Sequence, residues 1–331
     1  MLNTNSYVTV IATDFSKAFD TVRHVTLLEK LAALDLPDQV YNWLVNFFCG
    51  RTQCTTFNDS TSVLQEISAS IVQGSAIGPA CYVINASDLK AVNAGNVLCK
   101  YADDTYIIIP ACNVDTRNAE LENVEKWAKL NNLTLNRAKS AEMVLHDSRR
   151  KRKPVLPSLL ADVKRVQALK VLGVTMNHNL SVSDHVTNVI RSSAQTVHAL
   201  RLLRAHGMAD PSLHIVFRAV IVAKLTYAAS AWWGFASASD RSRLEAVLRR
   251  GKRSGLCPVD VTTVADLVGR TDDDLFEKAQ HPHHVLNNLL PKETVSNYEF
   301  RHRRHNLELI NKSTHLADSD FIIRMLYKDM Y

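Results

Sequence analysis

The chain has 331 residues, of which 46% are hydrophobic and 22% charged. This balance is that of a globular protein and excludes a disordered or membrane protein, and the length fits one large or two ordinary domains. The first 147 residues contain 11 Lys and Arg against 16 Asp and Glu, whereas the others contain 28 against 17. An acidic part with a net charge of −5 therefore precedes a basic part with a net charge of +11, which suits a protein whose later part binds nucleic acid.

Export and membrane insertion are not predicted. The first residues lack a basic segment followed by an apolar stretch, and Lys224 interrupts the apolar run Ala219 to Ala223, so we expect neither a signal peptide nor a membrane span. The six cysteines show no C-x₂-C spacing, and several lie within apolar runs, which indicates reduced thiols. We expect the protein to act in the cytoplasm and nucleus.

The first part of the chain alternates predicted strands and helices. Runs rich in β-branched or aromatic residues predict strands at 8–12, 51–57, 63–72, 97–99, 106–109 and 141–145. Helical spacing of apolar residues, or a Gly-Pro start, predicts helices at 24–34, 38–48, 78–94 and 115–130. This alternation is typical of an α+β domain.

From residue 184 the pattern changes to helices. Residues 184–205, 211–232 and 239–250 are each predicted as a helix that ends at a glycine. Leu172-Gly173-Val174 is expected in the last strand before them. We place the boundary near residues 178–184, which gives an α+β domain at 1–180 and a mainly helical domain at 181–331.

Carboxylates follow two of the predicted core strands. Asp103 and Asp104 lie between the apolar runs 97–99 and 106–109, and two adjacent carboxylates are costly in such a place unless they are neutralised. A solvated hairpin tip is the simpler interpretation of this pair alone. Asp14, however, ends a second core strand, so neighbouring strands would bring three carboxylates to one rim of a sheet. That set suits two Mg²⁺ ions in an in-line phosphoryl transfer.

These acidic strand ends belong to an ordered series of motifs. Asp14 to Asp20, Gln73 to Pro79 and Tyr101 to Asp104 occur in the order of the first three palm motifs of reverse transcriptases from non-LTR (LINE-type) retrotransposons, which the chain resembles. Leu135 to Ser140 resembles the fourth motif and Leu172 to Val174 the fifth. The resemblance also includes Trp127 and the tail segments 297–305 and 321–331.

The resemblance implies a right-hand polymerase fold, with an α+β palm of antiparallel sheet and packed helices followed by a helical thumb and C-terminal region. It implies an RNA-directed DNA polymerase that uses two Mg²⁺ ions, with Mn²⁺ as a substitute, to transfer a nucleotide from a dNTP to a primer 3′-hydroxyl. The partners would be an RNA template, a DNA primer and the upstream part of a polyprotein. Because only about seven residues precede the first strand, we expect that the fingers, and an endonuclease where one exists, belong to that upstream part.

The resemblance also assigns roles to individual residues. Asp14, Asp103 and Asp104 would be the catalytic metal ligands, which requires a sharp turn because adjacent strand residues face opposite ways. Lys139 would donate a proton to departing pyrophosphate, although a plain surface lysine is the simpler interpretation. The substrate-binding residues would be Phe15, Phe19, Gln73, Gly74 and Tyr101.

Among these, Phe19 resembles the steric gate, an aromatic ring that leaves no room for a 2′-hydroxyl; the alternative is a core phenylalanine at a helix start. Gln73 and Gly74 would contact the dNTP, and Tyr101 would contact the primer end.

Basic clusters in the second part are candidates for phosphate contacts. Arg249, Arg250, Lys252 and Arg253 form the first cluster and residues 301–305 the second, with a solvated surface as the alternative for each. Residues 149–154 fit a flexible loop, a nuclear address or a phosphate contact equally well.

Two other functions remain as alternatives. A catalytically inactive, truncated retroelement remnant that at most binds nucleic acid would keep the same fold. An unrelated two-metal nuclease is disfavoured, because it needs neither Phe19 nor the Gln73-Gly74 loop.

Overall fold

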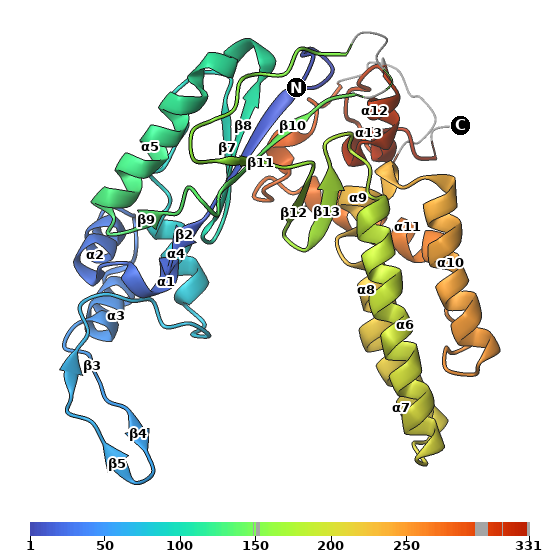
Figure 1. The fold of residues 1–331 in the computed structure, drawn as a ribbon, viewed down its shortest axis with the longest axis horizontal. Helices are drawn as coiled ribbons and strands as arrows, with labels where there is room; N and C mark the ends of the chain where they lie inside the picture. The colour runs from blue at the N-terminus through green and yellow to red at the C-terminus, as the bar shows by residue number, and fades with distance from the viewer. Residues whose placement is uncertain (148, 150–152, 295–303, 313, 330–331) are drawn as a thin grey trace. The chain divides into compact units, whose positions relative to one another are not determined.

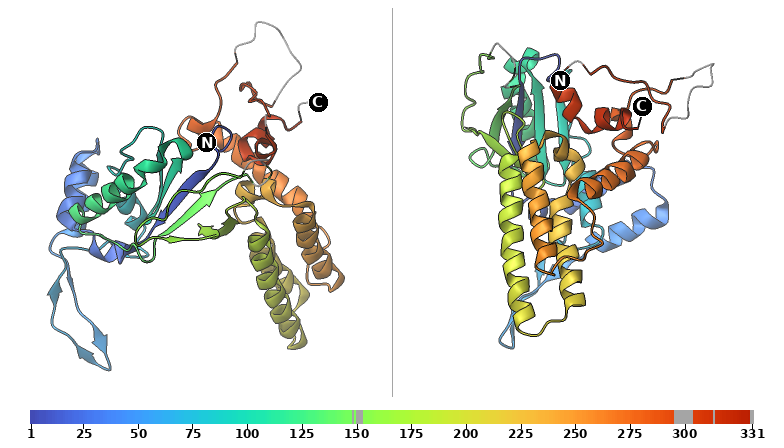
Figure 2. Two further views of the ribbon diagram at one scale, coloured as in Figure 1. Left: turned by 45° about the horizontal axis from the view of Figure 1, so that its top comes forward. Right: turned by 90° about the vertical axis from the view of Figure 1, so that its right-hand side faces the viewer.

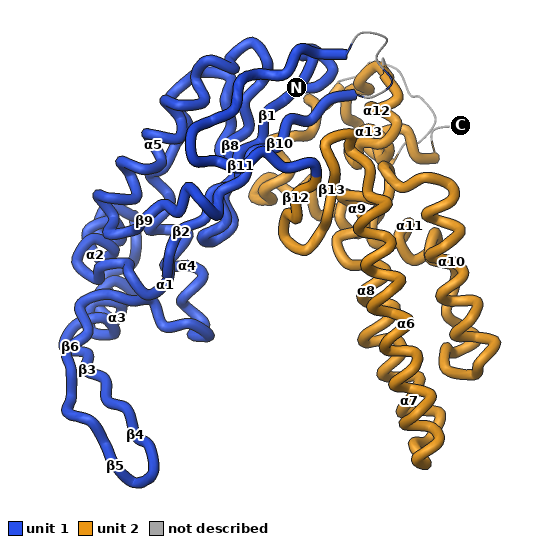
Figure 3. The backbone as a smooth tube through the Cα atoms, in the orientation of Figure 1, with its two compact units in different colours: residues 1–167 blue, residues 168–331 orange. Residues whose placement is uncertain are grey.

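The computed structural model describes residues 1–147, 149, 153–294, 304–312 and 314–329 (Figure 1). The backbone forms two compact units, residues 1–167 and 168–331 (Figure 3). The division precedes the hairpin of β12 (Ala168–Val171) and β13 (Val174–Asn177), whereas the sequence analysis placed it after this hairpin. Each unit has hydrophobic clusters of its own.

Unit 1 is built on a five-stranded sheet with the strand order β11-β10-β1-β8-β7. These strands are β1 (Val8–Thr13), β7 (Val97–Tyr101), β8 (Asp104–Pro110), β10 (Ala141–Leu145) and β11 (Lys164–Arg165). Only the β10–β11 pair is parallel, so the predicted antiparallel sheet with packed helices is confirmed. One prediction was wrong: β7 lies at the edge of the sheet and is half-exposed rather than buried.

The helices of unit 1 share one hydrophobic core with this sheet. They are α1 (Ala18–Thr21), α2 (His24–Ala32), α3 (Asp38–Phe48), α4 (Gly78–Asn85), η1 (Ala111–Thr116) and α5 (Arg117–Leu130), and β2 (Phe15–Ser16) pairs with β9 (Thr134–Leu135) beside them. The core joins Ile11 and Ile107 of the sheet to Leu121 and Val124 of α5. The helical spacing of these apolar residues is what made α5 predictable.

Helix α4 ends at Asn85 and does not continue to Ala94 as predicted. Two lysines from distant parts of the chain reach its C-terminal end: Lys30 donates to the carbonyl oxygen of Asn85, and Lys100 donates to that of Ala86. Cations at the last carbonyl groups stabilise a helix end. Because these partners come from α2 and β7, the local sequence gives no sign of where α4 stops.

A two-stranded arm takes the place of the two long strands predicted at 51–57 and 63–72. It consists of β3 (Thr52–Gln53) paired with β6 (Gln65–Glu66) and β4 (Thr56–Phe57) paired with β5 (Ser60–Thr61), and it extends away from α3 (Figures 1 and 2). All of residues 51–66 are exposed. The arm therefore contributes no side chain to the core.

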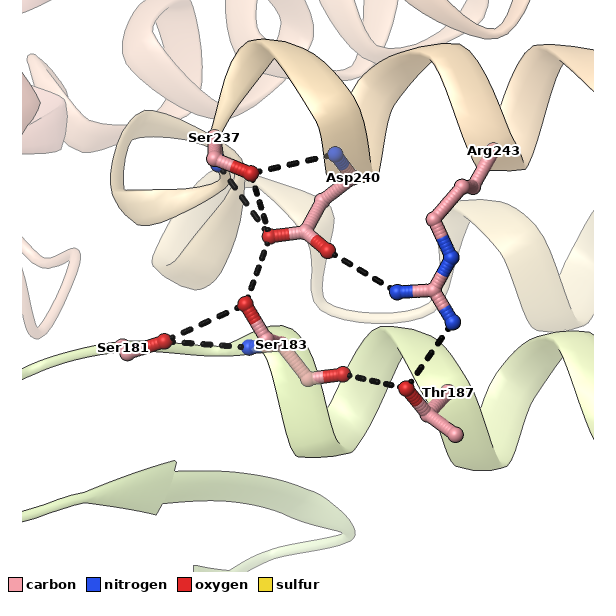
Figure 4. Close-up of polar contacts among 6 residues, drawn as sticks. All are labelled: Ser181, Ser183, Thr187, Ser237, Asp240 and Arg243. Atoms are coloured by element: carbon pink, nitrogen blue, oxygen red, sulfur yellow. Dashed lines mark hydrogen bonds and ion pairs between the residues drawn. The ribbon is translucent and has the colours of Figure 1, made fainter.

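Unit 2 is mainly helical, as predicted. Its helices are α6 (Ser183–Ala205), α7 (Asp210–Val216), η2 (Phe217–Val222), α8 (Ala223–Thr226), α9 (Ala229–Trp232), η3 (Trp233–Phe235), α10 (Ala238–Arg253), α11 (Val264–Ala279), η4 (Asn287–Leu289), α12 (His315–Ser319) and α13 (Phe321–Leu326). Figure 4 shows how α6 and α10 are joined at their N-terminal ends. The buried carboxylate of Asp240 accepts hydrogen bonds of 2.7 Å from Ser183 and Ser237 and pairs with Arg243. Burial raises the pKa of Asp240, but these hydrogen bonds outweigh burial and lower it.

One stretch of unit 2, Asp210–Phe235, is long and apolar enough to cross a membrane by length and composition, with a hydropathy of 1.4. Its buried residues Leu213, Phe217, Ile221 and Leu225 recur every fourth position and form part of the core of unit 2. The stretch is also interrupted at Tyr227 and Ala228, where Ala228 has a φ of 50°. Residues 213–225 of this stretch therefore pack into the core of unit 2.

The fifth motif also differs from its prediction, because only Val174 lies in a strand, at the start of β13. Leu172 and Gly173 form the turn between β12 and β13, with φ values of 45° and 89°. The Tyr227 hydroxyl donates to the carbonyl oxygen of Leu172 at 3.0 Å. A Cβ atom on Gly173 would lie 3.2 Å from the Tyr227 ring, so glycine suits both the backbone conformation and the close approach.

Candidate active site

The carboxylates predicted as metal ligands are carried by two adjacent strands. The last residue pair of β1 and β8 is Thr13 with Thr105, and the Thr13 hydroxyl donates to the Thr105 carbonyl oxygen at 3.0 Å. Asp14 follows Thr13 and Asp104 precedes Thr105, so both lie at the same end of the sheet. Asp103 lies in the turn between β7 and β8, where Ala102 has a left-handed φ of 51°. This is the sharp turn that the sequence analysis required.

The three carboxylates influence one another electrostatically. Partial burial, followed by the charges of Asp103 and Asp14, raises the pKa of the Asp104 carboxyl. Within the described part of the chain, no side chain donates a hydrogen bond to these carboxylates or forms an ion pair with them. Three carboxylates without a cationic partner repel one another.

The same three side chains do not form a ready metal cluster. Among the described residues, no group of three His, Cys, Asp or Glu side chains is arranged closely enough to hold a metal ion. Their chemistry nevertheless fits Mg²⁺ or Mn²⁺, because both prefer carboxylate oxygen ligands. A bound cation would offset the repulsion among the three carboxylates.

The fourth motif holds the backbone of Asp14. The Asn136 N–H donates to the Asp14 carbonyl oxygen at 2.8 Å, and the Asp14 N–H donates to the Ser140 hydroxyl at 3.2 Å. Ser140 is 1% exposed, and its hydroxyl donates to the Asn136 carbonyl oxygen at 2.8 Å. Sequence reasoning missed this role, although the spacing of Asn136 and Ser140 in a predicted loop was a usable sign of side-chain to backbone hydrogen bonds.

Lys139 lies in the same loop and is exposed. In the described residues no carboxylate pairs with its ammonium group. Its role as a proton donor stays a prediction.

We expect Ser140→Ala to weaken the site by releasing Asp14. The change leaves the part-buried Asp14 N–H without its acceptor, which should lower the free energy of unfolding by about 1 kcal/mol. Losing such a supporting hydrogen bond reduces activity roughly 10–100-fold. Urea denaturation and primer extension measure the two effects. Ser87→Ala is the matched control, because the exposed Ser87 hydroxyl bonds only the Ile84 carbonyl oxygen. Equal behaviour of the two variants would contradict the role of Ser140.

A backbone hydrogen bond connects Phe19 to the segment that leads into Gln73 and Gly74. The Ile71 N–H donates to the Phe19 carbonyl oxygen at 2.7 Å, which brings the loop at Gln73 and Gly74 beside Phe19. Gln73 and Gly74 are exposed, and Gly74 has a φ of 82°. A Cβ atom on Gly78 would lie 2.9 Å from the Ser75 hydroxyl and 3.1 Å from the Val72 carbonyl oxygen. Gly78 therefore lets this loop fold onto the first turn of α4.

The three aromatic residues in this group have different environments. Phe19 is partly buried and stacks on Tyr82, with ring centroids 4.7 Å apart and an interplanar angle of 26°. Tyr101 is 66% exposed at the end of β7. Phe15 is buried and packs edge-on against Trp127 at 6.0 Å, so its ring belongs to the core and presents no free face to a substrate.

The predicted nucleic-acid-binding residues lie at the C-terminal end of α10. Arg249, Arg250 and Arg253 are exposed, and over the described ranges no carboxylate pairs with them. Lys252 is half-buried, and its ammonium group donates to the Val259 carbonyl oxygen at 3.4 Å. Arg250 also lines a groove of about 170 Å³ together with Arg201 of α6. The groove adds a second helix to the predicted basic surface.

The other basic clusters give less support. Residues 301–303, like 150–152 of the cluster at 149–154, lie outside the described residues. Arg304 pairs with Asp273 and Asp329, and His305 is buried with its Nε2 3.0 Å from the Leu326 carbonyl oxygen. Both residues already have partners within unit 2, so phosphate contacts by Arg304 and His305 stay a prediction with less support.

Comparisons with known proteins agree with the motif order. Residues 1–176 match the family described as reverse transcriptase (RNA-dependent DNA polymerase). The chain is 30% identical over 190 residues to the RNA-directed DNA polymerase from mobile element jockey of Drosophila melanogaster, which covers 53% of this chain and 20% of that protein. It is 24% identical over 314 residues to the probable RNA-directed DNA polymerase from transposon BS of the same species, covering 86% and 34%.

The chain thus spans about a fifth to a third of the length of these relatives. Telomerase from Candida tropicalis, solved in complex with a fragment of telomeric RNA, has a TM-score of 0.42 and 11% identity, covering 84% of this chain and 40% of that chain. The family match covers more than half of the chain and contains all three acidic strand ends. The chain therefore belongs to the reverse transcriptase (RNA-dependent DNA polymerase) family.

Proposed function

We propose that the chain is the palm and thumb part of an RNA-directed DNA polymerase, with the palm at residues 1–180 and the thumb at 181–331. It would transfer a nucleotide from a dNTP to a primer 3′-hydroxyl on an RNA template. The observation that carries this proposal is the placement of Asp14, Asp103 and Asp104 at one end of the sheet without a described cationic partner. The names of the mobile-element relatives support it.

Enzymes of this family use divalent metal ions, and Asp14, Asp103 and Asp104 are the residues that would hold two Mg²⁺, or Mn²⁺ in their place. When bound, such ions lower the pKa of a hydroxyl nucleophile and neutralise charge on the transferring phosphate. The chain itself fixes the ligands. Ser140 and Asn136 hold the backbone of Asp14, and the turn at Ala102 positions Asp103 between two strands.

The remaining motif residues would bind the reactants. Phe19 would exclude a 2′-hydroxyl beneath the incoming sugar, and the exposed Gln73-Gly74 loop would contact the nucleotide. Tyr101, whose ring is largely exposed, would contact the primer end. Lys139 would donate a proton to the departing pyrophosphate. Phe15 would contribute through its backbone, since its ring is in the core.

The rest of the protein would supply further parts. Because the chain spans only about a fifth to a third of its relatives, we propose that it works as part of a longer retroelement polyprotein whose upstream segment provides fingers and, in many elements, an endonuclease. Copying of RNA and insertion of the DNA copy would place it in the cytoplasm and nucleus.

Primer extension on an RNA template tests this function. We expect slow, Mg²⁺-dependent addition of dNTPs by the 331-residue chain, because a triphosphate needs several charged partners. The motifs contain three cations, Lys17, Arg137 and Lys139, and Arg137 already pairs with Glu125. Poor orientation of the triphosphate, even by about 1 Å, slows a reaction roughly a hundredfold. Complete absence of extension, on a duplex that the protein demonstrably binds, would overturn the proposal.

Binding of an RNA–DNA duplex should be strongly salt-dependent, because lysines and arginines that contact phosphates release counterions. Replacing Arg249, Arg250 and Arg253 together by alanine should reduce the slope of log K against log salt by about 2–3, at about 0.9 per phosphate contact. Fluorescence anisotropy measures the slope. The exposed Lys129→Ala of unit 1 is the control and should leave it unchanged. A wild-type affinity that does not vary with salt would rule out this surface.

A further inference from the structure

Tyr82 of α4 connects two parts of the candidate active site. Its side chain is 1% exposed and is among the largest fully buried side chains of the described chain. One face of its ring stacks on Phe19 at 4.7 Å and 26°. Offset or tilted stacking of this kind contributes about 0.5–1.5 kcal/mol beyond the area it buries. Phe19 therefore has a defined support on the side of α4.

The hydroxyl end of Tyr82 lies within electrostatic range of one carboxylate, that of Asp103. Burial, and then the charge of Asp103, raises the pKa of the Tyr82 hydroxyl. In the described structure this buried hydroxyl has no hydrogen-bond partner. A single side chain thus contacts the predicted sugar-discriminating residue and lies within electrostatic range of a predicted metal ligand.

The segment that carries Phe19 is less firmly fixed than helix α4, which carries Tyr82. It lies on α1, a helix of four residues in which only Ala18 is buried, and which follows the left-handed Lys17 with its φ of 50°. Helix α4 is better fixed, because Lys30 and Lys100 bind the carbonyl groups at its end and Cys81 beside Tyr82 is buried. The position of the Phe19 ring is therefore set by α4 as much as by its own segment.

We propose that Tyr82 is a positioning residue that determines sugar specificity. Its ring keeps the Phe19 ring in the position that excludes a 2′-hydroxyl. The choice between deoxyribonucleotides and ribonucleotides therefore depends on α4 as well as on Phe19. This inference rests on the proposed polymerase function. The ring is required and the hydroxyl is not, since the hydroxyl makes no hydrogen bond that holds Phe19.

The test compares Tyr82→Leu and Tyr82→Met, which lose the stacking ring, with Tyr82→Phe, which keeps it. The measurement is the ratio of kcat/KM for a dNTP to that for the matching rNTP on the same primed RNA template. We expect Tyr82→Phe to keep the wild-type ratio within about twofold. Tyr82→Leu should reduce the ratio roughly tenfold, in the range that small changes in pocket shape produce, mainly through better use of the rNTP. If Tyr82→Leu does not fold, the same ratio is measured for Tyr82→Met.

A double variant and a spectroscopic measurement separate positioning from general damage. Phe19→Ala should lower the ratio further, and adding Tyr82→Leu to it should change nothing more, because the residue that Tyr82 positions is gone. The Phe19 ring protons should lose their ring-current shift in Tyr82→Leu and retain it in Tyr82→Phe, which NMR shows without any catalysis.

Two results would overturn the proposal. A parallel loss of dNTP and rNTP use in Tyr82→Leu would show only structural damage, and a loss of discrimination in Tyr82→Phe would transfer the role to the hydroxyl. Failure of the wild-type chain to extend primers, with the NMR result intact, would count against the polymerase function and not against the support of Phe19 by Tyr82.

Discussion

Asp103→Asn should reduce primer extension by roughly 10²–10³-fold, the loss typical of removing one group that stabilises charge in a transition state. The variant keeps the shape of the β7–β8 turn and removes a single negative charge. It should also weaken binding of Mn²⁺, measured by electron paramagnetic resonance, because an amide oxygen is a poorer ligand than a carboxylate. Metal binding tests the site independently of catalysis.

The same substitution should not destabilise the folded chain. Asp103 contributes to the repulsion that raises the pKa of Asp104, so neutralising it should leave the thermal midpoint unchanged or higher. Asp35→Asn is the matched control, since Asp35 is exposed and lies in the loop between α2 and α3; it should retain extension and Mn²⁺ binding. Extension by Asp103→Asn at the wild-type rate would remove the metal site from the proposed mechanism, whereas inactivity with a lowered midpoint would indicate misfolding.

Phe217→Ala should lower the free energy of unfolding of unit 2 by about 3–5 kcal/mol, the range for removing a buried aromatic side chain. Phe217 is 0% exposed and belongs to the core of this unit. Its ring fits against Gly251 of α10, where a Cβ atom would lie 2.5 Å from Phe217 Cζ and 3.0 Å from Cys257 Cβ. Gly251→Ala should therefore also lower the free energy of unfolding of unit 2, by about 1–3 kcal/mol, because the added methyl group overpacks the core. Hydrogen exchange of peptides from residues 210–260 reports on this unit alone.

The two changes should not be additive. With the ring removed, the new methyl group of Gly251→Ala no longer meets Phe217 but still lies 3.0 Å from Cys257 Cβ, and the higher helix propensity of alanine is worth about 1 kcal/mol. We therefore expect Gly251→Ala to destabilise the Phe217→Ala variant by less than it destabilises the wild type. Gly269→Ala on α11 is the control, because the nearest atom to its added Cβ is Lys328 Nζ at 3.9 Å, and it should stabilise both backgrounds. Equal effects of Gly251→Ala in both would contradict the close packing.

The parts that the sequence predicted well depend on local patterns. The runs around Asp14 and Asp103 read as strands because their apolar residues are contiguous, and the antiparallel pairing brings their acidic ends to the same end of the sheet. The end of α4 could not be predicted, because Lys30 and Lys100 arrive from other elements. The edge position of β7 likewise depends on strand order, which no local pattern contains.

The sequence analysis missed two site residues for the same reason. Ser140 and Tyr82 are neutral residues whose roles arise from what they touch, Asp14 in one case and Phe19 in the other. Charged residues at strand ends can be recognised in a sequence because burying a charge is costly. A serine in a loop or a tyrosine in an apolar helix carries no such cost. Only the three-dimensional contacts distinguish these two from ordinary loop and core residues.

The arm at residues 52–66 has a consequence for how the family can vary. Its two ends already meet, because the Ile67 N–H donates to the Arg51 carbonyl oxygen at 2.8 Å, while Phe48 before it and Ile71 after it are buried in the core. Lengthening or shortening the arm therefore changes no core contact, and the entropy of loop closure grows only slowly with length. Insertions and deletions among descendants of a common ancestor should accumulate here, between the first and second motifs, without disturbing either motif.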